Sequence, residues 1–268
     1  MGRLKKDPVF FVQKVLGGEP TVQQVLLLEA AGRPGAKVSV RSGHGTGKTT
    51  ALAWLVLWFL CTRRNAKVPC TAPTQAQLRD VLWAEVGKWR ERMPEWWRDQ
   101  VKVSTNRVEV TGAERSQFAV ARTAKPENPD ALQGFHADEL LFIIDEASGV
   151  YNKVFEVARG ALSTEAARVV MCGNPTQTTG YFFESHHRSR NEWECLHFSC
   201  LDSPLVDRKY PESMGREYGK DSDVFRVRVL GEFPRAAANQ LIPLDLVEEA
   251  MGRQLRTEQV AFAPKVIG

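Results

Sequence analysis

The sequence has little that would mark a membrane protein, a disulfide-rich secreted protein or a strongly charged one. Its longest uninterrupted apolar run, residues 51–61, falls well short of the roughly 20 residues that a membrane-spanning helix needs. Five cysteines are an odd number in 268 residues, so we expect reduced, buried thiols and no disulfide framework. The balance of 36 Lys and Arg against 32 Asp and Glu permits a nucleic-acid partner but does not indicate one.

The composition is that of a folded globular protein. Hydrophobic residues make up 43% and charged residues 25%, which excludes a wholly disordered or collagen-like chain. At about 150 residues per domain, the 268 residues predict one large domain or two small ones. Apolar runs alternate with helical patterns, which is typical of a layered α/β fold. The expected strands are 36–41, 67–74, 140–145 and 168–173, with 195–200 as a further candidate and a hairpin of 107–110 with 116–122.

A glycine-rich segment follows the first of these strands. Residues 42–49 read SGHGTGKT and lead directly into a helical pattern. The glycines let several backbone N–H groups point at one anion, and the N-terminus of the following helix adds partial positive charge. Lys48 can reach the outer phosphates of a nucleoside triphosphate, and the Thr49 hydroxyl can bind Mg²⁺. Ser42 departs from the common Walker A pattern, which has glycine at this position; the alternative is an ordinary glycine-rich turn.

Two adjacent carboxylates follow an almost purely apolar strand. The run LLFII over 140–144 predicts a strand buried on both faces, and Asp145 and Glu146 come directly after it. Open α/β sheets bind their ligands at the carboxyl ends of such strands. We expect Asp145 to serve Mg²⁺, as in a Walker B motif, and Glu146 to polarise the attacking water of a hydrolase. The competing interpretation is a helix N-cap, where acidic residues are also favoured.

A third buried strand also ends in a polar side chain. The segment VVMCGNPT, 169–176, places Asn174 directly after the strand 168–173. From there its amide could sense whether a γ-phosphate is present. The alternative is a simple Asn-Pro turn.

In this order, the three motifs resemble the ATPase domain of the large terminase subunit of tailed bacteriophages, the motor that pumps DNA into procapsids. Stretches 71–77, 132–141 and 227–234 are similar to that family as well. The resemblance implies an α/β P-loop NTPase of the ASCE type, with a mainly parallel central sheet flanked by helices and a small C-terminal helical and loop subdomain. The implied organisation is an ATPase core over 1–205 with an adenine-side segment over 1–35, a linker or lid subdomain over 206–255, and the start of a truncated nuclease domain over 256–268.

The same resemblance assigns catalytic roles. Glu146 matches the catalytic glutamate, and Lys48 and Arg41 match basic residues of the phosphate loop. Asn174 lies in the motif that is thought to couple hydrolysis to movement. The Mg²⁺ ligands would be Thr49 and Asp145.

Binding of ATP is the other implied property. Gln23 matches the glutamine that reads the adenine edge, with Gln24 as the competing choice and a solvated helix face as the alternative for both. The residues expected to contact ATP are Gln23, Ser42, Gly43, His44, Gly45, Thr46, Gly47, Lys48, Thr49 and Thr50.

The partners implied by the resemblance are double-stranded viral DNA, a portal protein and a small terminase subunit. The motor would act as a ring, with five subunits as the expected number, although isolated subunits of this family are commonly monomers. It would work in the host cytoplasm and have no membrane partner, and no nuclease activity is expected of this chain. Many family members carry a trans-acting arginine where this chain has Gln133, so Arg122 or Arg159 would have to replace it.

Two other functions compete with a DNA-packaging motor. One is a helicase-type ATPase acting on nucleic acid, since residues 71–75 resemble the segment after the phosphate loop of such enzymes. The other is a nucleotide-binding scaffold without turnover, against which the intact Lys48, Asp145 and Glu146 argue. Tryptophans alternate with arginines over 83–100, which favours an amphipathic helix over a DNA grip. The spacing of His186, His187, Cys195, His197 and Cys200 does not favour a zinc site.

Overall fold

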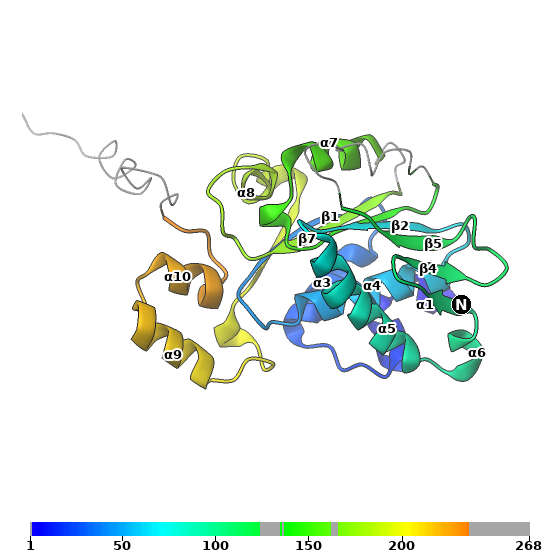
Figure 1. The fold of residues 1–268 in the computed structure, drawn as a ribbon, viewed down its shortest axis with the longest axis horizontal. Helices are drawn as coiled ribbons and strands as arrows, with labels where there is room; N and C mark the ends of the chain where they lie inside the picture. Colours follow the sequence, from blue (N-terminus) through cyan, green and yellow to red (C-terminus); the bar gives the residue numbers. More distant parts are fainter. Residues whose placement is uncertain (1, 124–134, 136, 162–165, 236–268) are drawn as a thin grey trace, which may run out of the picture.

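The computed structural model describes residues 2–123, 135, 137–161 and 166–235, and within them the chain forms one eight-stranded sheet between two layers of helices (Figure 1). The strand order is β3-β4-β5-β2-β6-β7-β1-β8. The strands are β1 Lys37–Ser42, β2 Lys67–Thr71, β3 Val101–Val103, β4 Arg107–Val110, β5 Phe118–Ala121, β6 Leu141–Ile144, β7 Arg168–Gly173 and β8 Glu194–Phe198.

The sheet is parallel from β5 through β8 in its spatial order and antiparallel only at the β3-β4-β5 end. β7 lies between β1, which leads into the glycine-rich segment, and β6, which leads into the acidic pair. A strand inserted between these two is the arrangement that the ASCE type requires, so the predicted fold class is confirmed. The hairpin of β4 with β5 and the candidate strand β8 are confirmed too, whereas β3 is a strand that the sequence reading missed.

Helices cover both faces of the sheet. In Figure 1, α7 and α8 lie above it, and α4 and α5 lie below it. The helical segments are α1 Gly2–Lys6, α2 Pro8–Phe11, η1 Val12–Leu16, α3 Val22–Gly32, α4 Lys48–Thr62, η2 Gln77–Trp83, α5 Ala84–Glu91, α6 Glu95–Arg98, η4 Ala147–Gly149, α7 Asn152–Ala161, α8 Tyr181–His186, η5 Arg190–Glu192, η6 Cys200–Asp202, α9 Lys209–Tyr218, α10 Asp223–Phe225 and η7 Arg226–Leu230.

The apolar run of the sequence forms the central helix α4. Every side chain from Ala51 to Leu60 is buried, because α4 is enclosed by the sheet, by α5 and by the N-terminal helices. Trp58 donates its ring N–H to the carbonyl of Leu4, which fixes α1 against this helix. No helix within the described residues is long and apolar enough to cross a membrane. All five cysteines are free thiols, as predicted.

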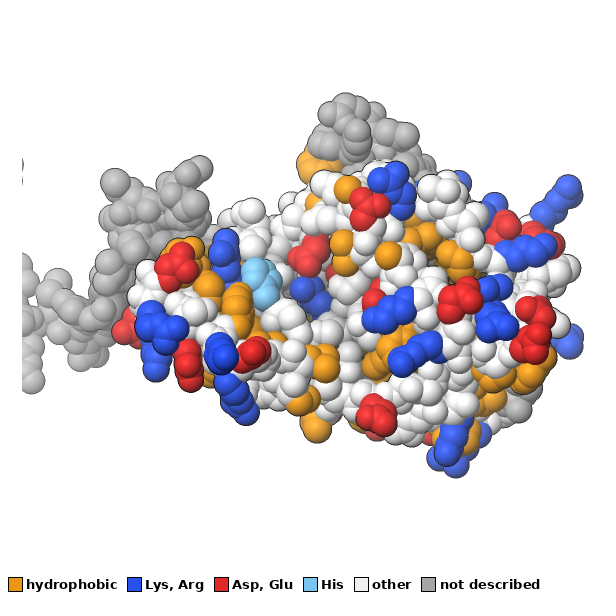
Figure 2. Space-filling view, turned by 60° about the horizontal axis from the view of Figure 1, so that its bottom comes forward, with side chains coloured by type: hydrophobic (Ala, Val, Ile, Leu, Met, Phe, Trp, Pro, Cys, Tyr) orange, Lys and Arg blue, Asp and Glu red, His pale blue; other side chains and the backbone are white. Residues whose placement is uncertain are grey.

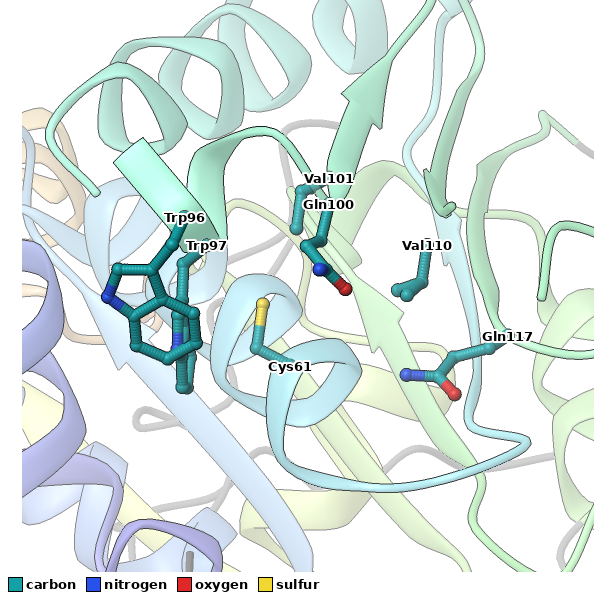
Figure 3. A pocket seen from close by; sticks show the side chains of 7 residues that line it. All are labelled: Cys61, Trp96, Trp97, Gln100, Val101, Val110 and Gln117. Atoms are coloured by element: carbon teal, nitrogen blue, oxygen red, sulfur yellow. The ribbon is translucent and has the colours of Figure 1, made fainter. Parts of the chain in front are cut away.

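The tryptophan-rich stretch is amphipathic, with one exception. Trp83, Trp89 and Trp97 are buried, whereas 66% of Trp96 is exposed. Figure 3 shows Trp96 and Trp97 side by side with Cys61 at a pocket of about 150 Å³. The inward-facing prediction is therefore wrong for Trp96, because α6 is a single short turn that has only one buried face.

Residues 206–235, named here the lid segment, form the small helical unit at the left of Figure 1. Met214 of α9, Phe225 of α10 and Val229 of η7 pack together with Cys200 in a small apolar cluster of their own. The lid segment is the described part of the subdomain predicted over 206–255. The rest of that range, and the predicted nuclease start over 256–268, lie outside the described residues.

Candidate nucleotide-binding site

The segment 42–47 curls between β1 and the first turn of α4. Gly45 and Gly47 have φ angles of +71° and +80°, a region that side chains with a Cβ rarely adopt. A turn of this kind directs backbone N–H groups towards its concave side, and the N-terminus of α4 opens onto the same place. The sequence order of strand, glycine-rich turn and helix thus produces the predicted phosphate loop.

Ser42 has a structural role in this loop. Its hydroxyl lies 2.6 Å from the Thr46 hydroxyl and donates to the carbonyl of Gly43 at 2.8 Å. Both Ser42 and Thr46 are buried. The side chain that replaces the usual glycine therefore ties the two ends of the loop together, which leaves the backbone curl intact.

Lys48 lies at the centre of the polar side chains. Its Nζ atom is 3.2 Å from Oε1 of Glu146 and donates to Oδ1 of Asn174 at 3.3 Å. Only 8% of Lys48 is exposed. Three motifs far apart in the sequence are therefore brought to one ammonium group, because the carboxyl ends of β1, β6 and β7 meet at one edge of the sheet.

The candidate Mg²⁺ site is formed by Thr49 and Asp145. The Thr49 hydroxyl donates to Oδ2 of Asp145 at 3.5 Å. Burial raises the pKa of Asp145 to about 6, and the neighbouring Lys48 ammonium opposes that rise. A hydroxyl beside a desolvated carboxylate is an oxygen donor set of the kind that Mg²⁺ prefers, so these two residues fit the ion.

Glu146 has an unusual backbone conformation. Its φ and ψ of 49° and 47° place a non-glycine residue in the left-handed region, which costs about 1–2 kcal/mol. Its N–H donates to Oδ1 of Asp145 at 3.0 Å, which helps to hold the turn. Strain of this kind persists only where the surroundings over-determine it. Here it aims the Glu146 side chain back at Lys48.

Contacts between the loops after β6 and β7 supply part of that restraint. The Ser148 hydroxyl accepts a hydrogen bond from the Thr176 N–H at 3.1 Å and lies 3.0 Å from the Thr176 hydroxyl. A Cβ atom on Gly173 would lie 2.8 Å from the backbone nitrogen of Ala147. The two loops therefore fit together too closely to move independently. The sequence reading missed Ser148, since a serine after an acidic pair carries no signal of its own.

Asn174 connects the phosphate loop to the loop after β7. Its Nδ2 atom donates to the Ser42 carbonyl at 2.6 Å, while its Oδ1 atom accepts from Lys48. The simple-turn alternative does not account for a buried amide with both ends bonded to the phosphate loop.

Gln23 and Gln24 are both buried, so the solvated-face alternative is wrong. Gln24 completes a capping box with Thr21 and donates to the Gly47 carbonyl at 2.9 Å, which occupies both ends of its amide. Gln23 donates to the Ser199 carbonyl at 3.0 Å, but its Oε1 atom is buried without a hydrogen-bond partner among the described residues. Of the two, only Gln23 has a free acceptor, as a reader of an exocyclic amino group requires.

The lid segment closes over the start of the phosphate loop. His44 donates its N–H to the Arg228 carbonyl at 2.8 Å, and the Cys200 thiol donates to the His44 carbonyl at 3.1 Å. A Cβ atom on Gly43 would lie 2.6 Å from both the Cys200 sulfur and the Val229 carbonyl oxygen. These contacts involve residues that the sequence reading did not assign to the site.

Two predicted ligands point elsewhere. Arg41 lies on the opposite side of β1 from Ser42 and lines a pocket with His186 of α8, so its side chain does not join Lys48. Its role at the phosphates stays a prediction that this placement does not favour. The Thr50 hydroxyl donates to Glu85 of α5 at 2.8 Å, which leaves only its backbone for a phosphate.

The candidates for a trans-acting arginine are only partly described. Gln133 and the side chain of Arg159 lie outside the described residues. Arg122 directly follows β5, and its guanidinium carbon lies 5.3 Å from the centre of the Phe135 ring. The histidines and Cys195 of the doubted zinc site share one pocket, but no group of three or more metal-binding side chains is found in the described part of the chain.

Comparisons with known proteins agree with this geometry. A family model described as an AAA domain matches residues 20–180. The probable terminase large subunit of Enterobacteria phage P7 is 34% identical over 254 residues, which are 90% of this chain and 51% of that protein. The chain thus spans about half the length of the curated relative that it matches.

Solved structures show the same fold at lower identity. The large terminase ATPase domain of Thermus phage P74-26 aligns with a TM-score of 0.64 at 19% identity, covering 82% of this chain and 96% of that one. The large terminase of another thermophilic bacteriophage, in complex with ADP, aligns with a TM-score of 0.62 at 14% identity, covering 87% and 54%. The predicted resemblance to the ATPase domain of phage large terminase subunits is confirmed, and the chain belongs to the AAA domain family.

Proposed function

We propose that this chain binds ATP with Mg²⁺ in the phosphate loop, hydrolyses it with Glu146, and drives double-stranded DNA into procapsids as the motor of a phage terminase. The observation that carries the proposal is the meeting of Lys48, Glu146 and Asn174 within hydrogen-bond distance at the mouth of the loop. The second of the two solved terminases, whose structures hold ADP or ATP-γ-S, supports the choice of nucleotide.

In this proposal, the γ-phosphate of ATP takes the place of Glu146 beside Lys48. The Lys48 ammonium is paired with the Glu146 carboxylate in the structure, and an arriving phosphate competes for the same positive charge. Glu146 is then free to orient a water molecule and take its proton. Mg²⁺ at Thr49 and Asp145 would neutralise charge on the β- and γ-phosphates.

Asn174 would report the state of the γ-phosphate. Its Oδ1 atom bonds Lys48, whose own partner changes when ATP binds, and its Nδ2 atom holds the Ser42 carbonyl. A shift of Lys48 therefore reaches both the phosphate loop and the loop after β7. We propose that this movement passes to the DNA grip, and that the chain acts in a ring on a portal with a small terminase subunit in the host cytoplasm.

The test is phosphate release from Mg²⁺-ATP by the wild type and by Glu146→Gln. General-base catalysis contributes about 10²–10⁴-fold, so we expect a loss of that order in kcat with ATP affinity retained. Lys48→Ala is the control for binding, because it removes the cation that holds the phosphates. Hydrolysis that survives Glu146→Gln would refute the assigned role, and no wild-type hydrolysis with DNA and portal present would refute the motor.

The helicase-type alternative is tested in the same preparation. A helicase would separate the strands of a duplex in an ATP-dependent way, whereas a packaging motor moves the duplex intact. The same basic charge would serve both, so strand separation is the measurement that distinguishes them.

A further inference from the structure

A second pocket lies on the α8 side of the sheet, away from the cluster around Lys48. It encloses about 290 Å³ between β1, β8, the end of α8 and the last residues of the lid segment. Its walls contain two arginines and three histidines. They are formed by Arg41, His186, His187, Arg190, Cys195, Leu196, His197 and Phe233.

Positive charge at this pocket exceeds negative charge. Arg41 is half-buried, and its guanidinium has no hydrogen bond or ion pair with any residue that the structure describes. The charged groups that act on it are one carboxylate, Glu232, and two further guanidiniums, Arg190 and Arg226. Glu232 is already bound to Arg226 at 2.9 Å. Three guanidiniums therefore share one carboxylate.

The histidines shape the pocket without neutralising it. The His197 Nε2 atom donates to the Leu230 carbonyl at 2.6 Å, and the His187 Nδ1 atom donates to the Phe183 carbonyl at 2.8 Å, which fixes both rings. His186 is held by the Ser39 hydroxyl at 2.9 Å. Burial lowers the pKa of His186 to about 3, so this ring is neutral near pH 7.

We propose that this pocket binds a phosphate-type oxyanion, the chemistry shared by the DNA backbone and free inorganic phosphate. Guanidinium groups bind such oxyanions through two parallel hydrogen bonds, and the Arg41 donors are free to do so. The volume leaves room for the sugar attached to a backbone phosphate, which favours DNA. On the face drawn in Figure 2, acidic and basic side chains are interspersed and form no single basic surface for DNA.

The position of the pocket gives such a contact a consequence. Arg41 immediately precedes the phosphate loop, and His197 and Phe233 connect the pocket to the lid segment. A bound phosphate would therefore touch the core and the lid segment at the same time. Because the proposal concerns binding alone, it stands or falls independently of ATP hydrolysis.

The experiment measures binding of a fluorescent DNA duplex by anisotropy, without nucleotide, at several salt concentrations. Arg190→Gln is the main variant, because Arg190 is exposed and its loss does not disturb the fold. We expect affinity to fall about 3- to 10-fold and the salt slope to fall by about one. Arg41→Gln should have the same effect, with circular dichroism as the check on folding. Arg188→Gln is the matched control, since Arg188 is exposed nearby but does not line this pocket.

A second titration uses inorganic phosphate in the Lys48→Ala background, which weakens binding at the phosphate loop. Loss of phosphate binding on Arg190→Gln with unchanged DNA affinity would support the site and assign it to free phosphate. Unchanged binding of both probes would overturn the proposal. So would unchanged binding with a loss of self-association in sedimentation, because the pocket would then take an acidic side chain of a second copy.

Discussion

Replacing Gly43 with alanine should open the contact between the phosphate loop and the lid segment. The new Cβ atom would lie 2.6 Å from the Cys200 sulfur and the Val229 carbonyl oxygen and 3.0 Å from the Arg228 carbonyl oxygen. Two of these three atoms are backbone, so the crowding cannot be relieved by a side-chain rotation. The lid segment must move away, which breaks the hydrogen bond from His44 to Arg228.

The magnitude follows from the cost of overpacking. Inserting a methyl group into a close-packed site costs about 1–3 kcal/mol, and for a chain of this size each kcal/mol lowers Tm by about 2–4 °C. We therefore expect Gly43→Ala to lower Tm by about 2–12 °C in a thermal melt followed by circular dichroism. ATP affinity, measured with a fluorescent analogue, should fall as well because the loop loses its support.

The chain offers two controls for this measurement. Gly87→Ala in α5 meets no atom within 4 Å, so it should raise Tm slightly through better helix propensity. Gly43→Ala combined with Cys200→Ala removes the sulfur but leaves the Val229 carbonyl, so it should recover only part of the loss. The reasoning is refuted if Gly43→Ala leaves both Tm and nucleotide affinity unchanged.

Three further predictions concern catalysis, acidity and surface exposure. Ser148→Ala should lower kcat with little change in the KM for ATP, because it frees the loop that restrains Glu146, and Ser148→Thr should keep the wild-type rate; equal rates for all three proteins would contradict this. The raised pKa of Asp145, about 6 against an ordinary 3.8, means that the folded state loses stability as the pH rises through roughly 4 to 6. In EDTA, the free energy of unfolding of wild type relative to Asp145→Asn should therefore fall by about 1 kcal/mol between pH 5 and pH 8, and a constant difference in urea melts would count against the buried carboxylate. Trp97→Ala should destabilise by about 3–5 kcal/mol, whereas Trp96→Ala should stay within about 0.5 kcal/mol, and similar losses in denaturant titrations would contradict the exposure of Trp96.

Much of the site was predictable because its signals are local. The glycines of 42–47, the apolar strand before Asp145 and the strand before Asn174 each define their own secondary structure. Parallel strands place their carboxyl ends at one edge, so the meeting of Lys48 with Glu146 and Asn174 follows once the strands are found. The choice between Gln23 and Gln24 did not follow, since adjacent residues share the same local pattern.

The sequence by itself determined the strands, the order of the motifs and the type of chemistry that each motif carries, because hydrophobic periodicity and turn residues act over a few neighbouring positions. Only the tertiary structure decided that Arg41 faces away from the phosphate loop, that Trp96 is exposed, and that the lid segment closes on Gly43. These outcomes depend on which face of an element is covered by segments distant in the sequence. No local pattern records that choice, because it is set by how the whole chain shares its buried surface.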